Sequence, residues 1–356
     1  MTQKPTVHFV YKSPRHGGLI GRGLDYMGIN YPNLIDPIWR RGDHITWKIP
    51  KRHPASASFN LIKEFRRRGP LKFYDLWEKG ECDIKPGDKF IALPVHVYDG
   101  RTWDDPSIQR VTTRTLEKYP DLDATIIMPY CHDELYTRSI RGLLERYHPK
   151  AVLLSGEIWT RDWDKSPIKN LVSDILRVNM GIDPNEYPRL KTSFNPKGKR
   201  KYLYIGQTAW YKNTKQLEEI AKAMPQFEFG YISQGNIEGW KKIASWADLT
   251  TEFMAQVTAE YDFFINTSTA DPSPATILEQ MCFGLPVACT PESSYEYDSI
   301  VRLDVKDIAF NVRQLEAMQY QSEEDLIRIA DTNRELAIKN HNWEEISADI
   351  ANFILK

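Results

Sequence analysis

Residues 262–287 read DFFINTSTADPSPATILEQMCFGLPV, and this stretch gives the clearest indication of the fold. The apolar run at 262–266 predicts a buried strand, and the polar, proline-containing residues 267–274 predict a loop. Residues 275–283 predict a helix, which Gly284 ends before a second short apolar run. Strand, loop, helix and strand in this order are typical of a parallel sheet covered by helices.

The same alternation of short apolar runs and amphipathic stretches, such as the helical spacing of residues 217–224, recurs along the whole chain and predicts an α/β protein. The predicted strands are 7–11, 45–49, 90–95, 124–129 and 151–155 in the first half, and 202–205, 227–232, 262–266 and 286–289 in the second. A chain of 356 residues is long enough for two domains. Because the polar segment 188–201 interrupts the pattern, we expect a linker there, an N-terminal domain at 1–188 and a C-terminal domain from residue 189. The carboxyl ends of both sets of strands are expected to face an interdomain cleft.

Composition excludes several classes of protein. Hydrophobic residues make up 41% of the chain and charged residues 27%, which fits a folded chain and excludes a disordered or collagen-like one. No apolar run reaches the length of a membrane-spanning helix or of a conventional signal segment, so the expected location is the cytoplasm. The four scattered cysteines predict free thiols. The sequence shows no cluster of His and carboxylate residues, so we expect no tightly held metal.

Two carboxylates flank the start of the predicted helix. Asp271 precedes it and Glu279 lies one or two turns inside it, so both can face the same ligand while residues 275–277 present amide N–H groups. The amides and the helix dipole suit a phosphate, and each carboxylate can accept hydrogen bonds from a pair of sugar hydroxyls. This arrangement indicates a site for a phosphorylated sugar. The alternative is that Asp271 only caps the helix and that Glu279 is a surface residue.

The segment resembles the E-x7-E signature of retaining GT-B glycosyltransferases, especially those of family 4 (glycosyl transferases group 1), with Asp271 in place of the first Glu. Other motifs occur in the family's order: residues 13–19 are similar to its Gly-rich loop, 41–46 to R-G-H-E-V-T, 178–188 to N-G-I-D-x-x-x-F-x-P, 204–213 to V-G-R-L-x-x-x-K-G, and 341–346 to its terminal aromatic-Trp helix. The resemblance covers nearly the whole chain and is strongest from about residue 178 onward. It implies the GT-B fold: two Rossmann-like domains, the second at 189–337 binding the nucleotide sugar, and a helix at 338–356 that returns to the first.

The resemblance also implies an activity and roles for individual residues. The protein would be a retaining hexosyltransferase that uses a UDP- or GDP-sugar as co-substrate and no tightly bound cofactor. Glu279 would bind the donor ribose, Asp271 the sugar hydroxyls, and Lys212 would neutralise the departing diphosphate. The remaining donor contacts implied are Gly17, Gly18, Gly206, Gln207, Ala275, Thr276 and Ile277. The chain departs from the family at Gln207, where the family has Arg, and at Pro274, which has no N–H to donate.

Two histidines follow predicted strands of the first domain. His132, in the sequence His132-Asp133, is similar to the family's strand-end His-Asp, whose histidine sits near the reacting sugar, and His96 is the second candidate. The alternative for both is a structural histidine that is hydrogen-bonded at the end of a strand.

Positive charge gathers where this family binds the acceptor. Residues 1–70 hold 13 basic and 4 acidic side chains, and basic and aromatic residues interleave from 39 to 74. Arg15, Arg66, Arg67 and His96 are the acceptor-side candidates. Such a patch fits a glycan or anionic lipid headgroup, with the protein peripheral at the inner membrane face. Modified DNA is the other acceptor considered, because bacteriophage DNA α-glucosyltransferases share this fold; the net charge of -1 weakens this version, and the basic first 70 residues keep it open. The third interpretation is a solvated helix face.

The sequence indicates no obligate protein partner. The alternative function to glycosyl transfer is a non-catalytic GT-B scaffold that binds a sugar nucleotide, and Gln207 and Pro274 are the residues that keep this alternative open.

Overall fold

A computed structural model describes residues 4–11, 57–76, 80–94, 103, 105, 110–128, 134–245, 249–272 and 274–356. The chain divides into two compact units. Unit 1 comprises Met1–Ser155, Trp159–Val178 and Trp343–Lys356, and unit 2 comprises Gly156–Ile158 and Asn179–Asn342.

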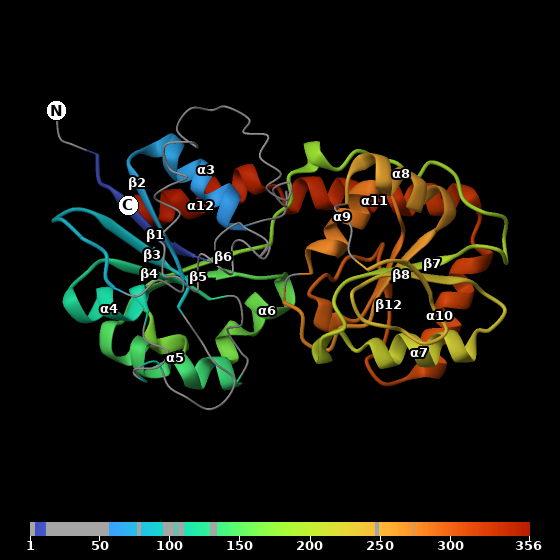
Figure 1. Cartoon of the computed structure of the whole chain (residues 1–356), viewed down its shortest axis with the longest axis horizontal. Helices are drawn as coiled ribbons and strands as arrows, with labels where there is room; N and C mark the ends of the chain where they lie inside the picture. The colour runs from blue at the N-terminus through green and yellow to red at the C-terminus, as the bar shows by residue number, and fades with distance from the viewer. Residues whose placement is uncertain are drawn as a thin grey trace. The chain divides into compact units, whose positions relative to one another are not determined.

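Unit 1 contains a parallel six-stranded sheet in the order β2-β1-β3-β4-β5-β6. Its strands are β1 (Val7–Tyr11), β2 (Leu71–Asp75), β3 (Lys89–Ala92), β4 (Ala124–Ile127), β5 (Lys150–Leu154) and β6 (Ile175–Val178). The described helices are α3 (Ala57–Arg68), α4 (Val111–Lys118), α5 (Glu134–Tyr147), α6 (Glu157–Arg161, whose first residues belong to unit 2) and α12 (Trp343–Leu355), with short 3₁₀ turns at Asp162–Lys165 and Lys169–Leu171. Helices α3 and α12 lie side by side on one face of the sheet, and α4 and α5 cover the other (Figure 1).

Unit 2 contains a second parallel six-stranded sheet, in the order β12-β11-β10-β7-β8-β9. Its strands are β7 (Tyr202–Ile205), β8 (Phe229–Ile232), β9 (Lys241–Ala244), β10 (Phe263–Asn266), β11 (Val287–Cys289) and β12 (Val301–Arg302). Its helices are α7 (Thr214–Ala223), α8 (Thr251–Glu260), α9 (Ala275–Phe283), α10 (Ile308–Tyr320) and α11 (Glu323–Asn340), with 3₁₀ turns at Pro184–Glu186, Trp210–Lys212 and Pro291–Ser293. Helices α8, α9 and α11 cover one face of the sheet, and α7 and α10 cover the other (Figure 1).

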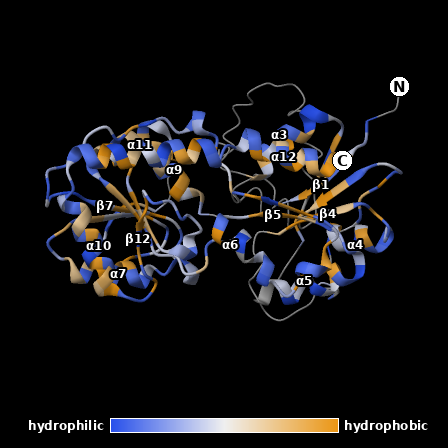
Figure 2. Cartoon of the chain, turned by 180° about the vertical axis from the view of Figure 1, so that it is seen from behind, coloured by the Kyte–Doolittle hydropathy of each residue, from blue (hydrophilic) through white to orange (hydrophobic). Residues whose placement is uncertain are grey.

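Side chains of β7 alternate between two hydrophobic cores. Leu203 and Ile205 pack against α8 and α9, whereas Tyr202 and Tyr204 pack against α7 and α10. Successive side chains of a strand point to opposite faces, so a central strand covered by helices on both sides has to be apolar throughout. Figure 2 shows the same pattern, with hydrophobic strands inside and hydrophilic residues on the outer faces of the helices.

The order of the strands reverses between β7 and β10. From β7 the chain proceeds through β8 to β9 on one side, and then returns to the other side of β7 to form β10, β11 and β12. All these strands are parallel, so the loops that follow β7 and β10 leave the same edge of the sheet side by side. In open α/β sheets this switch point is where ligands bind.

The predicted strands are present within about three residues of their expected limits, except 45–49, which lies outside the described residues. The four strands that the sequence did not predict are β2, β6, β9 and β12. These are the two edge strands of each sheet.

Residues 188–201 contain no helix or strand, as predicted, but they pack onto the sheet of unit 2 and do not link the units. The Nζ atom of Lys191 lies 2.9 Å from Oδ1 of the buried Asp262 and donates to the Thr258 carbonyl at 2.8 Å. Arg200, also buried, donates to four backbone carbonyls. Buried charges are tolerated when they are paired and hydrogen-bonded in this way, so these two side chains fix the segment to the sheet.

The segments by which the chain enters and leaves unit 2 are bonded to each other. The N–H of Ile182 donates to the carbonyl of His341 at 2.6 Å, and Ile182 forms a parallel bridge with Asn342. Nδ1 of His341 donates to the Met180 carbonyl at 2.7 Å, and Nε2 accepts from the Tyr297 hydroxyl at 2.7 Å. Burial lowers the pKa of His341 to about 4, so the ring is neutral at pH 7.

Candidate functional site at the switch point of the unit 2 sheet

Lys212 and Asp271 meet at the switch point. Lys212 ends the 3₁₀ turn after β7, Asp271 lies in the loop after β10, and the ammonium group of Lys212 forms an ion pair with Oδ2 of Asp271. Only 12% of the Lys212 side chain and 11% of the Asp271 side chain are exposed. The structure therefore joins two of the residues that the sequence predicted to be functional, although 59 positions separate them.

The two loops are also joined through their backbones. The N–H of Thr269 donates to the carbonyl of Tyr211 at 2.8 Å, and the hydroxyl of Thr267 donates to the carbonyl of Asn213 at 3.2 Å. Asn213 has φ 51° and ψ 44°, the left-handed conformation. This is the position where the resembled motif has Gly, and Asn is one of the few other residues that adopts this conformation readily. Hydrogen bonds from the loop after β10 therefore hold the turn at Tyr211 and Asn213, the residues before and after Lys212.

The backbone around Asp271 is held from two directions. Its N–H donates to the carbonyl of Glu292 at 3.1 Å, and its carbonyl accepts from the hydroxyl of Ser294 at 3.3 Å. Ser294 has φ 76°, a value that non-glycine residues rarely adopt and that is often found at functional sites. A Cβ atom on Gly156 would lie 2.1 Å from the Cβ of Ser294, so only glycine fits beside this turn.

Glu279 lies inside unit 2, in the second turn of α9, with 0% of its surface exposed. The hydroxyl of Tyr187 donates to its Oε1 at 3.1 Å. Burial, and next the neighbouring charge of Glu279, raises the pKa of Tyr187 far above its usual value, so Tyr187 keeps its proton and acts as a donor. The alternative that Glu279 is a surface residue is therefore wrong. Tyr187 occupies the motif position where the family has Phe, and its extra hydroxyl is the signal that sequence reasoning overlooked.

The start of α9 differs from the prediction in two respects. The residue that caps the helix is Pro274, which makes no side-chain capping bond, so Asp271 is not the cap. The N–H of Ile277 donates to the carbonyl of Pro274 at 3.0 Å and is not available to a ligand, contrary to the prediction for residues 275–277. Ala275 and Thr276 are half-buried at the first helical positions, where N–H groups have no partner within the helix.

Gly206 and Gln207 follow β7 directly. A Cβ atom on Gly206 would lie 2.6 Å from the hydroxyl oxygen of Tyr204, which donates to the carbonyl of Gln207 at 2.6 Å. The close approach of Tyr204 explains the glycine at this position. The Gln207 side chain, which replaces a cation of the family motif, is exposed.

The remaining predicted residues lie in unit 1 or outside the described part of the chain. Arg66 and Arg67 lie in the last turn of α3, and the guanidinium of Arg67 donates to both carboxylate oxygens of Glu64 at 2.8 and 2.7 Å. The neighbouring Arg68 contacts Glu64 and also donates to Asn352 of α12 at 2.6 Å. Part of this basic cluster therefore stabilises α3 and its packing. The predicted residues outside the described part are Arg15, Gly17, Gly18, His96 and His132.

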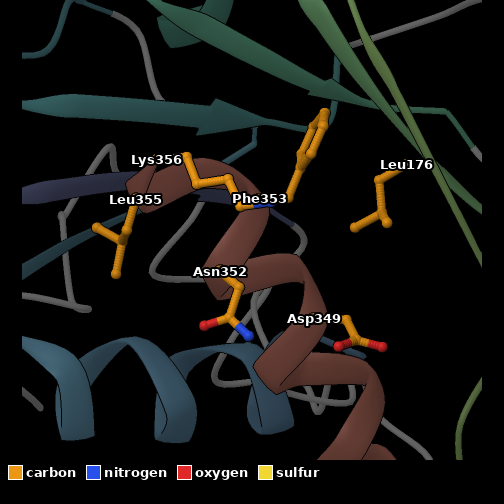
Figure 3. Close-up of a pocket in the computed structure, with 6 residues that line it drawn as sticks. All are labelled: Leu176, Asp349, Asn352, Phe353, Leu355 and Lys356. Atoms are coloured by element: carbon orange, nitrogen blue, oxygen red, sulfur yellow. The ribbon is translucent and has the colours of Figure 1, made fainter.

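A cavity of about 660 Å³ lies in unit 1, beside the end of α12 (Figure 3). Its lining comprises Leu176, Asp349, Asn352, Phe353, Leu355 and Lys356. None of the residues predicted to be functional lines this cavity, so its position gives no support to the predicted chemistry.

Other predictions concern cysteines, metals and membranes. Cys82, Cys282 and Cys289 are buried free thiols, and burial raises the pKa of the last two to about 12. In the part of the chain that the structure covers, no His, Cys, Asp and Glu side chains gather into a group that could hold a metal ion. None of the helices described above combines the length and apolar character that a membrane crossing needs.

Comparisons with known proteins find solved structures with a similar fold. No family model and no curated protein matches the chain. Sucrose-phosphate synthase from Thermosynechococcus elongatus matches with a TM-score of 0.60 and 10% identity, over 98% of each chain. WaaG, a glycosyltransferase involved in lipopolysaccharide biosynthesis, matches with a TM-score of 0.52 and 13% identity, over 98% of this chain and 99% of WaaG.

The chain has the GT-B fold. TarM matches it with a TM-score of 0.52 and 13% identity, over 74% of this chain, which spans only 54% of TarM. At these identities the likeness concerns the fold alone.

Proposed function

We propose that the protein is a glycosyltransferase that moves a sugar from a nucleotide-sugar donor to a hydroxyl group of a glycan, with retention of configuration. The ion pair of Lys212 and Asp271 at the switch point is the observation that carries the proposal. A cation and a carboxylate at the carboxyl edge of the sheet, next to the start of α9, supply the groups that a sugar diphosphate needs.

Solved structures with this fold support the choice of donor. A mutant of S. aureus TarM has been solved with Fondaparinux, α-GlcNAc-glycerol and UDP, and the pneumococcal O-GlcNAc transferase GtfA with UDP and GlcNAc. Both match this chain with a TM-score of 0.50, over 74% and 75% of its length. We infer that a UDP-sugar is the first donor to test.

In the proposed reaction the bond between the anomeric carbon and the diphosphate oxygen breaks, and the acceptor oxygen bonds to that carbon on the same face. The acceptor proton passes to the departing diphosphate. Lys212 stabilises the negative charge that develops on the diphosphate, and the N–H groups of Ala275 and Thr276 bind its oxygens. Asp271 holds Lys212 in place before the donor binds, and accepts hydrogen bonds from the sugar hydroxyls afterwards.

Glu279 binds the ribose in this scheme, with its carboxylate oriented by Tyr187. By resemblance alone, the proposal also gives His132 a place near the reacting sugar, and Gly17 and Gly18 a contact with the donor phosphate. Catalysis then depends on positioning the donor and stabilising the leaving group.

The test measures nucleotide release from UDP-, GDP-, ADP- and CMP-sugars, first without acceptor and then with glycan, lipid-extract and hydroxymethylated-DNA acceptors. We expect Lys212→Ala to lower kcat about 100-fold, because one stabilising charge is lost from the transition state. Glu279→Ala should mainly weaken nucleotide binding. Lys222→Ala, which removes an exposed lysine of α7, is the matched control and should behave like the wild type.

Two results would contradict the proposal. One is wild-type turnover in both site variants, with Asp271→Asn tested in parallel in case Lys212→Ala folds poorly. The other is a wild-type protein that neither releases nucleotide from any donor nor is stabilised thermally by any nucleotide. Stabilisation without turnover would favour the binding scaffold over the enzyme.

A further inference from the structure

Trp210 is the most exposed large hydrophobic side chain that the structure describes. The exposed fraction is 79% for Trp210, compared with 61% for Tyr320 and 37% for Ile338. Tryptophan is highly buried on average, because a large apolar surface in water is costly. The indole at this position therefore offers an uncovered apolar face to a ligand.

The backbone beneath Trp210 is rigid. Trp210 begins the 3₁₀ turn that ends at Lys212; its carbonyl accepts from the N–H of Asn213 at 3.2 Å, and the N–H of Lys212 donates to Ala209 at 2.9 Å. The ring of Tyr211 stands edge-on to the indole, at 5.8 Å between centroids and 86° between planes. A tryptophan on a hydrogen-bonded turn has only two side-chain torsions to restrict, so it binds a ligand with little loss of conformational entropy.

The position of Trp210 distinguishes between the two substrates of the proposed reaction. Trp210 lies two residues before Lys212, at the carboxyl edge of the sheet, whereas Glu279, the proposed ribose ligand, is fully buried. Under the proposed function the nucleoside is held at Glu279 inside unit 2, so the exposed indole beside Lys212 is left for the second substrate, the acceptor.

We propose that Trp210 binds the acceptor by stacking its indole against the apolar C–H face of a sugar ring. This inference rests on the proposed function and names a residue that selects the acceptor. The indole offers a broad apolar face for the ring and an N–H donor at its edge for a hydroxyl. Trp210 would then determine the preference for a glycan acceptor over a small alcohol.

The experiment compares Trp210→Ala, Trp210→Phe and Tyr320→Ala with the wild type. Tyr320 is the matched control, because it is an exposed aromatic residue of the same unit that packs near Gly198, beside the amino end of β7 and so at the opposite edge of the sheet. The probes are an immobilised panel of mono- and oligosaccharides for binding, and the glycan acceptor found in the turnover assay for kinetics.

We expect Trp210→Ala to weaken glycan binding and to raise the acceptor KM about tenfold or more, as loss of a binding hot spot does. The rise in donor KM should be smaller. Trp210→Phe should retain part of the affinity, and Tyr320→Ala all of it.

The inference would be overturned by glycan binding that is equal in Trp210→Ala and the wild type, by a larger effect on donor KM than on glycan binding, or by no glycan binding by the wild type. Loss of binding to DNA or lipid vesicles in place of glycans would overturn it as well. The binding panel needs no donor. Failure of the proposed function, seen as absent nucleotide release, is therefore distinguishable from failure of this inference.

Discussion

Removal of the Asp262 side chain should destabilise unit 2 strongly. Asp262 is fully buried, and its Oδ1 accepts from the backbone N–H of Asn195 at 2.9 Å and contacts Lys191 at the same distance. Its Oδ2 accepts from the N–H of Lys201 at 2.9 Å and from the side-chain amide of Asn195 at 2.8 Å. Asp262→Ala therefore leaves one buried ammonium group and three N–H donors without this acceptor.

The expected loss follows from these contacts. Breaking a buried ion pair by removing one partner costs about 3–5 kcal/mol, and each buried donor left unpaired adds about 1–3 kcal/mol unless water reaches it. We expect Asp262→Ala to lower the free energy of unfolding of unit 2 by at least about 4 kcal/mol, a large share of the typical total of about 5–15 kcal/mol. Lys191→Met should cost less than half as much, because Asp262 keeps three donors.

Hydrogen exchange measured by mass spectrometry on peptides from β7 and β10, at increasing urea concentration, reports on unit 2 specifically. Glu228→Ala is the control, because Glu228 forms an exposed ion pair with Lys201, and such pairs contribute about 1 kcal/mol or less. A loss below about 1 kcal/mol in Asp262→Ala, or an equal loss in Glu228→Ala, would show that Asp262 does not hold residues 188–201 on the sheet.

Three further predictions concern pH, backbone conformation and the buried carboxylate. The pKa of His341 is about 4 in the folded chain and about 6.5 in the unfolded chain, so the unfolded chain binds more protons below pH 6.5. Stability should fall as pH drops from 6.5 toward 4, by about 3 kcal/mol in total, and urea titrations across this range should show a flatter profile for His341→Gln. Asn213→Gly should leave the melting temperature nearly unchanged, whereas Asn213→Val should cost about 1–2 kcal/mol because its φ is positive; equal melting temperatures would contradict this explanation. Tyr187→Phe should cost about 1–3 kcal/mol and weaken nucleotide binding in calorimetry, because Glu279 loses a donor; an unchanged affinity would separate Tyr187 from the site.

The central strands were predictable from the sequence and the edge strands were not. Strands such as β7 and β10 are buried on both faces and form continuous apolar runs. At the edge of the same sheet, β9 begins with two exposed lysines, Lys241 and Lys242, which hide its apolar pattern. Charged side chains on edge strands prevent pairing with other chains, so the feature that protects the edge also conceals the strand.

The parts of the candidate site that were predictable are those whose residues belong to one local sequence motif. The spacing of Asp271 and Glu279 placed both around a helix start, and in the structure Asp271 precedes α9 and Glu279 lies in its second turn. The ion pair of Lys212 with Asp271 depends on the order of strands in the sheet, which no local pattern encodes. The bond between Tyr187 and Glu279 likewise joins residues 92 positions apart. Contacts of this kind follow from topology and could not be derived from sequence spacing.

The hydrogen bonds that join Ile182 to His341 hold the two ends of unit 2 together, so the unit can be permuted or inserted into another chain. Both ends of the segment from Asn179 to Asn342 are held side by side by hydrogen bonds within the unit. Chains with neighbouring ends tolerate circular permutation and insertion into hosts, because a short peptide can close or continue them. Unit 2 inserted into a loop of a host protein, or opened at a new position, should therefore keep the strand order that brings Lys212 to Asp271.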